Sequence, residues 1–171
     1  MSADEVDEII LAWSRERPDL DVSPLEVLSR VSRLARHLDR SRRKAFGDSG
    51  LELWEFDVLS ALRRAGPPYE LSPGKLIAST LVTSGTMTNR IDRLTQKGLV
   101  ARRPDEHDRR GVLVRLTPTG RDLVDRALTA LLAHERSMLA GLSADQRDQL
   151  AGLLRALVQS FDRPVHTPGR A

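Results

Sequence analysis

The chain has 171 residues, 40% of them hydrophobic and 30% charged, with a formal net charge of +3 and no cysteine. This length is sufficient for one domain with a hydrophobic core, and the absence of cysteine excludes disulfides, thiolate metal ligands and thiol redox chemistry. No apolar run approaches the roughly 20 residues needed to cross a bilayer, and residues 1–8 are acidic where a secretion signal would be basic. We therefore expect a cytoplasmic protein without a membrane partner.

Two helices are expected in the N-terminal part of the chain. The first spans residues 4–16, and the second spans residues 24–46 and ends at Gly47. The second should begin with a capping box, in which the Ser23 hydroxyl and the Glu26 carboxylate satisfy free N–H groups of the first turn.

A central helix and a helix-turn-helix pair follow. Residues 52–65 are apolar on almost every face, which predicts a helix in the middle of the core. Residues 72–80 should form a short helix. Residues 83–97 should form the next one, with Thr83 or the serine after it as the cap and Gly98 as the left-handed residue that ends it.

Two short strands complete this region. Residues 100–103 and 112–116 alternate apolar and polar side chains, as half-buried strands do, and the charged segment 104–110 joins them as a hairpin. A helix with a polar face, a glycine stop and a charged hairpin occur in this order in a winged helix-turn-helix. We therefore predict a mainly α fold with a small β-hairpin wing.

Basic residues gather in the same region. Between Ser72 and Leu116 the sequence has nine Lys and Arg against four Asp and Glu, a net of +5, which leaves −2 of the total +3 for the rest of the chain. A basic module on a slightly acidic body suits contact with nucleic-acid phosphates on one face. A charged face that contacts only solvent is the weaker alternative, because the winged-helix order accompanies the charge.

The helix over residues 83–97 has two different faces. Met87, Ile91 and Leu94 recur at helical spacing and should face the core. In a DNA major groove the opposite face would meet base edges, where Asn pairs with adenine, Arg with guanine and Thr with a thymine methyl group. The residues predicted to read bases are Thr86, Asn89, Arg93 and Gln96. The residues predicted to bind phosphates, at or near helix starts, are Ser72, Lys75, Thr83 and Ser84.

The tip of the predicted hairpin carries a second candidate contact. Asp108 can hold one of its two neighbours, Arg109 and Arg110, while the other arginine enters a narrow minor groove with its negative potential. The alternative is that these three residues only form an ion pair that closes the turn.

The helices at the two ends of the chain have more apolar surface than a small winged helix can cover. Residues 117–139 and 143–161 should form amphipathic helices, the second of which begins with a capping box of Ser143 and Gln146. Pairing with a second copy of the chain would bury the exposed apolar surface, and helices 4–16, 24–46 and 143–161 should build that interface. A two-fold homodimer places two recognition helices on one duplex face and predicts a pseudopalindromic operator. The expected organisation is dimerisation helices in 1–50, a DNA-binding lobe in 51–120, dimerisation helices in 121–161 and a disordered tail in 162–171.

Five segments of the sequence together resemble a known family. Residues 53–59, 89–94, 97–100, 108–110 and 116–120 read LWEFDVL, NRIDRL, KGLV, DRR and LTPTG. In this order, over about residues 24–160, they are similar to the MarR family of bacterial transcription regulators. The resemblance implies a homodimeric winged-helix repressor whose terminal helices dimerise. It also implies that a small anionic or phenolic ligand, bound between the dimer core and the DNA-binding lobes, often lowers the affinity for DNA.

Four residues are similar to the ligand signature of the urate-responsive branch of that family: Trp13, Asp57, Arg90 and Arg102. Trp13 offers a stacking face, the two arginines offer charge-assisted bonds to an anion, and Asp57 can tether an arginine. Arg90 should point inward on its helix, and Asp57 should be a buried carboxylate that requires a cation. The alternatives are that Trp13 packs in the core or an interface, that Asp57 pairs with an arginine for structure, and that the anion is a polycarboxylate.

No pattern in the sequence favours an enzyme. The four histidines lie far apart without metal-ligand spacing, and no phosphate-binding glycine loop or activated nucleophile is recognisable. We expect no cofactor and no metal. The function predicted is therefore a ligand-responsive DNA-binding repressor, and the alternative is a DNA-binding regulator that acts by occupancy alone.

Overall fold

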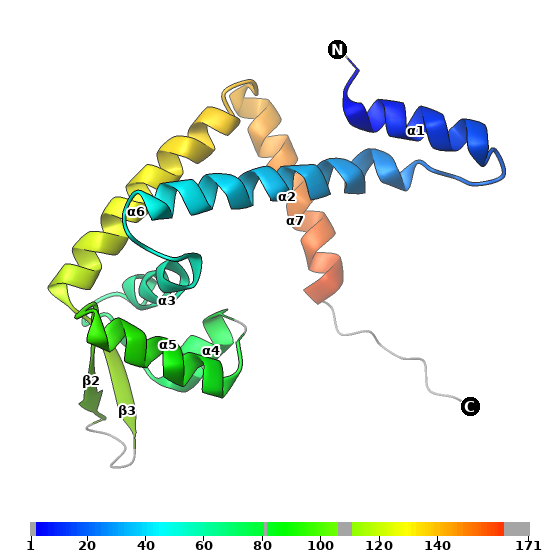
Figure 1. The fold of residues 1–171 in the computed structure, drawn as a ribbon. Helices are drawn as coiled ribbons and strands as arrows, with labels where there is room; N and C mark the ends of the chain where they lie inside the picture. The colour runs from blue at the N-terminus through cyan, green and yellow to red at the C-terminus, as the bar shows by residue number, and fades with distance from the viewer. Residues whose placement is uncertain (1–2, 81, 106–110, 163–171) are drawn as a thin grey trace, which may run out of the picture. The chain divides into compact units, whose positions relative to one another are not determined.

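A computed structural model describes residues 3–80, 82–105 and 111–162. These residues form seven helices and one small three-stranded sheet (Figure 1), which confirms the predicted mainly α fold with a β-hairpin wing. The chain divides into two compact units, Met1–Leu132 and Ala133–Ala171, and each is described by itself. None of the helices in the described part of the chain is long and apolar enough to cross a membrane.

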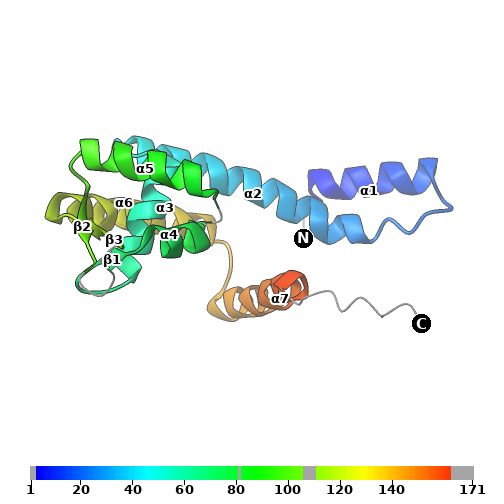
Figure 2. The same ribbon diagram turned by 90° about the horizontal axis from the view of Figure 1, so that it is seen from below.

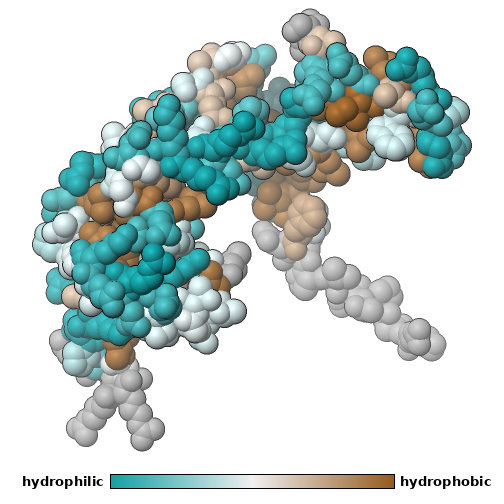
Figure 3. All heavy atoms as spheres, in the orientation of Figure 1, coloured by the Kyte–Doolittle hydropathy of each residue, from teal (hydrophilic) through white to brown (hydrophobic). Residues whose placement is uncertain are grey.

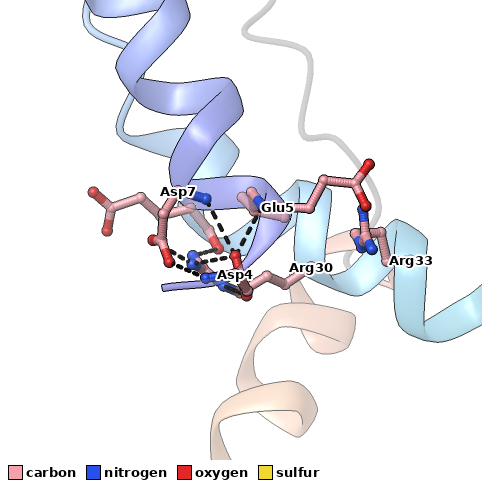
Figure 4. A network of polar contacts seen from close by, with 7 residues as sticks. Asp4, Glu5, Asp7, Arg30 and Arg33 are labelled. Carbon is pink, nitrogen blue, oxygen red and sulfur yellow. Dashed lines mark hydrogen bonds and ion pairs between the residues drawn. The ribbon is translucent and has the colours of Figure 1, made fainter. Parts of the chain in front are cut away.

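Helices α1 (Glu5–Glu16) and α2 (Pro24–Gly47) lie side by side and form an arm at the N-terminal end of the first unit (Figures 1 and 2). Asp4 caps α1 by accepting hydrogen bonds from the backbone N–H groups of Val6 and Asp7. Figure 4 shows how charged residues join the helices: Arg30 of α2 binds Asp4 at 2.9 Å and Asp7 at 2.7 Å, and Arg33 pairs with Glu5. The bounds of both helices agree with the prediction to within a residue.

The predicted capping box at the start of α2 is wrong. Ser23 has helical backbone angles, φ −55° and ψ −32°, and its side chain caps nothing. A capping hydroxyl needs an extended backbone at its own residue, whereas here the chain already turns at Val22 and Ser23, whose carbonyls accept from Leu25 and Glu26. Pro24 occupies the first helical position, as expected.

The lobe that follows the arm has a closed hydrophobic core. Helices α3 (Leu53–Arg64), α4 (Pro73–Thr80) and α5 (Ser84–Gln96) pack around it together with the sheet (Figure 2). The fully buried side chains at its centre are Val58, Leu59, Leu62, Leu76, Met87, Ile91, Leu94 and Val114. Phe46 at the end of α2 stacks on Phe56 of α3, with ring centroids 4.2 Å apart, so the arm is anchored in this core. As predicted, α3 is central.

The sheet contains one strand more than expected. Strands β2 (Val100–Pro104) and β3 (Val112–Leu116) pair antiparallel as predicted, and β1 (Glu70–Leu71) adds to the free edge of β3 in the order β1-β3-β2. Two residues are too few to show an alternating pattern, and the strand that pairs with β1 lies far along the chain. The sequence therefore gives no local sign of β1. The extra strand leaves β3 paired on both sides.

Helix α6 (Pro118–Met138) begins on the backbone that follows α5. The Thr117 hydroxyl donates to the carbonyls of Gly98 and Leu99 at 2.8 and 3.0 Å and accepts from Gly120 N at 3.0 Å. A Cβ at Gly120 would lie 2.1 Å from the Leu99 carbonyl oxygen, a separation that no side chain allows. The start of α6 is therefore in direct backbone contact with the end of the turn after α5.

The second unit contains the end of α6 and helix α7 (Ala144–Asp162). Ser143 and Gln146 form the predicted capping box, with Gln146 N donating to the Ser143 hydroxyl at 3.2 Å and Ser143 N to the Gln146 side chain at 2.9 Å. Leu153, Val158 and Phe161 of α7 are exposed. The disordered tail was predicted to begin at Asp162, but this residue is the last of α7; the rest of the predicted tail, residues 163–171, lies outside the described residues.

Candidate nucleic-acid interface

Helix α5 has the orientation that the sequence predicts. The Thr83 hydroxyl caps it by accepting from Thr86 N, and Gly98 follows its end with φ +68°, a left-handed conformation that suits glycine. Met87, Ile91 and Leu94 are at most 1% exposed. Because these three side chains fix the rotation of the helix, its opposite face is exposed, and Figure 3 shows hydrophilic residues covering this face of the lobe. The four predicted base-reading residues are all exposed: Thr86, Asn89, Arg93 and Gln96.

One of these four, Arg93, is already engaged by the lobe. Its Nη2 donates to the Glu52 carboxylate at 2.8 Å, and its guanidinium lies 4.8 Å from the centre of the Trp54 ring. Arg90, predicted to point inward, is half-buried and lies over the same ring at 5.4 Å. The two arginines therefore share one aromatic neighbour rather than facing different regions. A shallow hollow of about 600 Å³ is formed by Glu52, Trp54, Gly85, Thr86, Asn89, Arg90 and Arg93.

The predicted phosphate-binding residues lie at the starts of α4 and α5. The Ser72 hydroxyl accepts from Lys75 N at 3.4 Å, so Ser72 caps α4 while the Lys75 side chain extends into solvent. Thr83 and Ser84 are exposed at the start of α5, and the Thr83 hydroxyl lies 2.9 Å from that of Thr86. Free N–H groups and a lysine at two neighbouring helix starts suit phosphate oxygens.

The wing residues Arg109 and Arg110, with Asp108, lie outside the described residues. The base of the wing carries an ion pair that the sequence analysis did not find. Arg103 of β2 binds Glu70 of β1 through two hydrogen bonds, of 2.8 and 2.6 Å, which cross the outer side of β3. Arg103 lowers the pKa of Glu70, first through these hydrogen bonds and then through its charge.

The predicted ligand-binding residues are only partly brought together in one chain. Asp57 lies near Arg90, whose charge, with those of Arg42 and Arg64, opposes the increase in the pKa of Asp57 that partial desolvation causes. Arg102 instead forms an ion pair with Asp92 at 2.7 Å.

Trp13 lies elsewhere, in the last turn of α1. Its side chain is 50% exposed and lines a surface cleft with residues of the turn between α1 and α2 and of the start of α2. The end of α1 and the turn into α2 lie at the end of the arm that is remote from α3 and α5 (Figure 1). A site that uses Trp13 with Asp57 therefore needs a contribution from a second chain.

The expectation that Asp57 is buried is wrong, because the structure exposes Asp57 and buries Glu55 instead. Glu55 is 0% exposed; it accepts from Lys97 Nζ at 2.5 Å and from the backbone N–H of Glu52 at 3.0 Å. The pair ties the beginning of α3 to the end of α5. The sequence offers one sign of this role for Glu55: it is the third residue of α3, a position where Glu often caps the start of a helix.

Among the described residues no group of three or more His, Asp and Glu could hold a metal ion. The arrangement offers hydrogen-bond donors, cations and helix starts on one face. These groups can bind a polyanion and discriminate between base edges.

Comparison with known proteins agrees with this geometry. Residues 49–111 match the sequence profile of the MarR family. Over 150 residues the chain is 39% identical to the HTH-type transcriptional regulator PecS of Dickeya dadantii, covering 88% of this chain and 90% of that protein. The chain belongs to the MarR family. Its fold and its assignment to the transcription regulators are thereby confirmed.

Two further comparisons bear on function. The HTH-type transcriptional repressor NicR of Pseudomonas putida is 32% identical over 82% of this chain and 90% of its own length. The solved structure of BpsR from Bordetella bronchiseptica, whose DNA binding is regulated by 6-hydroxynicotinic acid, is 31% identical with a TM-score of 0.65, covering 77% of this chain and 92% of that one. PecS and NicR are transcription regulators rather than enzymes, in agreement with the prediction. The urate-responsive branch is not established by these matches.

Proposed function

We propose that this MarR-family chain is a homodimeric repressor that reads a pseudopalindromic operator with α5 and is released from it by a small organic anion. One observation carries the proposal. The complete burial of Met87, Ile91 and Leu94 turns a face of hydrogen-bonding side chains outward on the helix that follows a helix-turn. In a major groove, Asn89 and Arg93 can bind adenine and guanine edges, and Thr86 can contact a thymine methyl group.

The apolar surface of the arm supports the homodimer. Val27, Val31 and Leu34 recur at helical spacing along α2, and all are more than one third exposed. Hydrophobic residues also gather along α1 (Figure 3), where Leu11 and Trp13 are at least half exposed. A second copy that covers these side chains would remove the apolar surface from water, and two-fold symmetry would place two α5 helices on one face of the duplex.

The charges around Asp57 support an anionic effector such as urate or a polycarboxylate. Three arginines, Arg42, Arg64 and Arg90, act on this one carboxyl. Arginine side chains at one place would also attract an organic anion, and Arg90 is the member that belongs to α5. An anion that binds Arg90 therefore alters the surroundings of Arg93, because both guanidiniums lie on Trp54. The regulation of BpsR by a small aromatic acid is consistent with this assignment.

Selection of bound sequences from a random DNA pool, repeated with urate, citrate and 6-hydroxynicotinate, tests the proposal. We expect an enriched inverted repeat whose half-sites lie about one helical turn, roughly 34 Å, apart, and weaker binding with at least one anion. Arg90→Ala should abolish the response to the anion. No enriched sequence would refute DNA reading, and DNA affinity that is unchanged across the panel would refute only the effector.

A second candidate function, repression by occupancy without a ligand, is favoured by the separation of Trp13 and Arg102 from Asp57 in one chain. Trp13→Ala distinguishes the two functions, because it should reduce the anion response only if Trp13 of one chain completes a site in the dimer. A titration that follows the fluorescence of Trp13 as candidate anions are added requires the Trp54→Phe background. The chain has two tryptophans, and Trp54 lies beside Arg90 and would otherwise contribute to the signal.

A further inference from the structure

We infer that Glu52 and Trp54 of the lobe are specificity-determining residues: they hold the Arg93 guanidinium in the orientation in which its free edge reads a guanine. The inference rests on the proposed reading of DNA by α5 and adds two residues that lie outside that helix. Neither belongs to the set predicted from the sequence to contact DNA.

The contacts restrict Arg93 on two sides. The Trp54 ring lies against its guanidinium at 4.8 Å, and Glu52 Oε1 accepts from its Nη2 at 2.8 Å. The other oxygen of the same carboxylate, Oε2, accepts from the Trp54 indole N–H at 2.6 Å. Glu52 is thus oriented by Trp54, and Arg93 is oriented by both.

Arg93 remains able to bind a base in this arrangement. An arginine has five N–H donors, and reading the O6 and N7 atoms of guanine requires two of them. The contact with Glu52 uses one Nη2 hydrogen, and the side chain remains 48% exposed. The Glu52 carboxylate and the Trp54 ring already fix the orientation of the Arg93 guanidinium. Arg93 therefore loses less conformational freedom when it binds the base.

A carboxylate beside a DNA-reading arginine also acts against the wrong partner. Hydrogen bonding from Trp54 and the charges of Arg93 and Lys97 lower the pKa of Glu52, so the group is ionised at neutral pH. An Arg93 that leaves Glu52 to contact a phosphate exposes this negative charge to the DNA backbone. Non-specific binding is therefore penalised while the guanine contact is kept, which is how a repulsive group raises specificity.

The experiment measures the affinities of wild type and Glu52→Gln for three DNAs. These are the selected operator, an operator altered at the base pair where Arg93→Ala loses its sequence preference, and unrelated DNA. Gln keeps the backbone contact of residue 52 with Glu55 but removes the charge. We expect the ratio of operator to altered-operator affinity to fall about tenfold, while binding to unrelated DNA becomes tighter. The matched control is Glu70→Gln, which removes a carboxylate that binds Arg103 instead and should leave the ratio unchanged.

Two variants separate positioning from general effects. In the Arg93→Ala background, Glu52→Gln should no longer change the ratio, because there is no guanidinium to orient. Trp54→Phe keeps the ring but removes the indole N–H, so it should lower the ratio less than Glu52→Gln does, and it replaces Glu52→Gln if that variant does not fold.

Three outcomes distinguish the possibilities. An equal gain in affinity for all three DNAs would show that Glu52 only repels DNA and would overturn the inference. An unchanged ratio in Glu52→Gln, with a ratio lowered by Arg93→Ala, would overturn the inference and leave the proposed function intact. If neither Arg93→Ala nor Asn89→Ala relaxes the preference at any base pair of the operator, the reading of DNA by α5 itself fails.

Discussion

The lobe and the arm of the first unit are held together by different forces. In the lobe, α3, α4, α5 and the sheet, together with the end of α2 and with α6, bury a continuous set of apolar side chains, several of them completely. In the arm, Val6 is the buried apolar side chain of α1, and α1 and α2 are joined by ion pairs of Arg30 and Arg33 with acidic residues (Figure 4). Val27, Leu28, Val31 and Leu34 of α2 remain exposed.

The difference indicates which part of the protein is complete in one chain. The lobe excludes water from its own core, and hydrophobic burial is the dominant favourable contribution to folding. Exposed ion pairs such as those of the arm contribute little, because solvent and salt screen them. The lobe, with the end of α2 and with α6 packed on it, should therefore be stable within one chain, whereas the rest of the arm should depend on a second copy of the chain.

The largest expected effect is a cavity in the lobe. Leu94→Ala removes a side chain that is 0% exposed, and we expect the free energy of unfolding to fall by about 3–4 kcal/mol. Urea denaturation at fixed protein concentration measures this loss. Gln96→Ala, on the exposed face of the same helix, serves as the control and should change the stability by less than about 0.5 kcal/mol. Similar losses in the two variants would contradict the assigned rotation of α5.

The next effect concerns the buried carboxylate of the lobe. Lys97→Met leaves Glu55 buried without its cation, and we expect a loss of about 2–3 kcal/mol, less than for a fully buried pair because Lys97 is 43% exposed. Glu55→Gln removes the charge itself and keeps hydrogen-bonding atoms, so its cost should be smaller, about 1 kcal/mol. The reverse order in chemical denaturation would show that the pair is not desolvated as the structure indicates.

The arm should respond through association rather than folding. Val27→Asp places a charge on an apolar side chain that is 56% exposed in the single chain. We expect the dimer dissociation constant to rise at least about tenfold, equivalent to about 1.4 kcal/mol, in sedimentation equilibrium. Ser32→Asp adds the same charge to an exposed polar position of α2 and should have little effect. Equal dissociation constants for Val27→Asp and wild type would place the dimer interface elsewhere.

The smallest expected effect concerns the ion pairs of the arm. The hydrogen bond from Arg30 lowers the pKa of Asp4 below its usual value of 3.8. Because the folded pKa is the lower one, this carboxyl stabilises the fold above about pH 3.8 and loses that contribution as the pH falls through its folded pKa. Arg30→Ala should weaken α1 slightly at neutral pH and reduce its sensitivity to acid. Circular dichroism across this range, with Arg15→Ala as the control, measures the difference.

The local features of the fold could be predicted from the sequence. The ends of α5 follow from Thr83 and Gly98, and its rotation follows from Met87, Ile91 and Leu94, because caps and helical spacing involve residues only a few positions apart. Ser23 shows the limit of such signals. Its residue type suits a cap, but the turn before it gives it a helical backbone.

Contacts between distant parts of the chain could not be predicted in this way. The helical pattern predicts Asp57 rather than Glu55 as the buried carboxylate, and this is wrong because the deciding partner of Glu55 is Lys97, 42 residues further on. The exposure of Arg93 was correctly predicted from the helix period, but its contact with Glu52, 41 residues away, was not. A helix period gives the direction of a side chain, whereas the neighbour that it meets depends on the packing of other helices.

The contact at Gly120 has a mechanical consequence. With the Leu99 carbonyl at the position where a Cβ would lie, and with Thr117 bonded to both Gly98 and Leu99, no compressible side chain separates the first turn of α6 from the end of α5. A rotation of the first turn of α6 should therefore move the end of the base-reading helix with it, because the two segments are in direct backbone contact. Gly120→Ala would force this joint apart, so the position has no substitute among the amino acids.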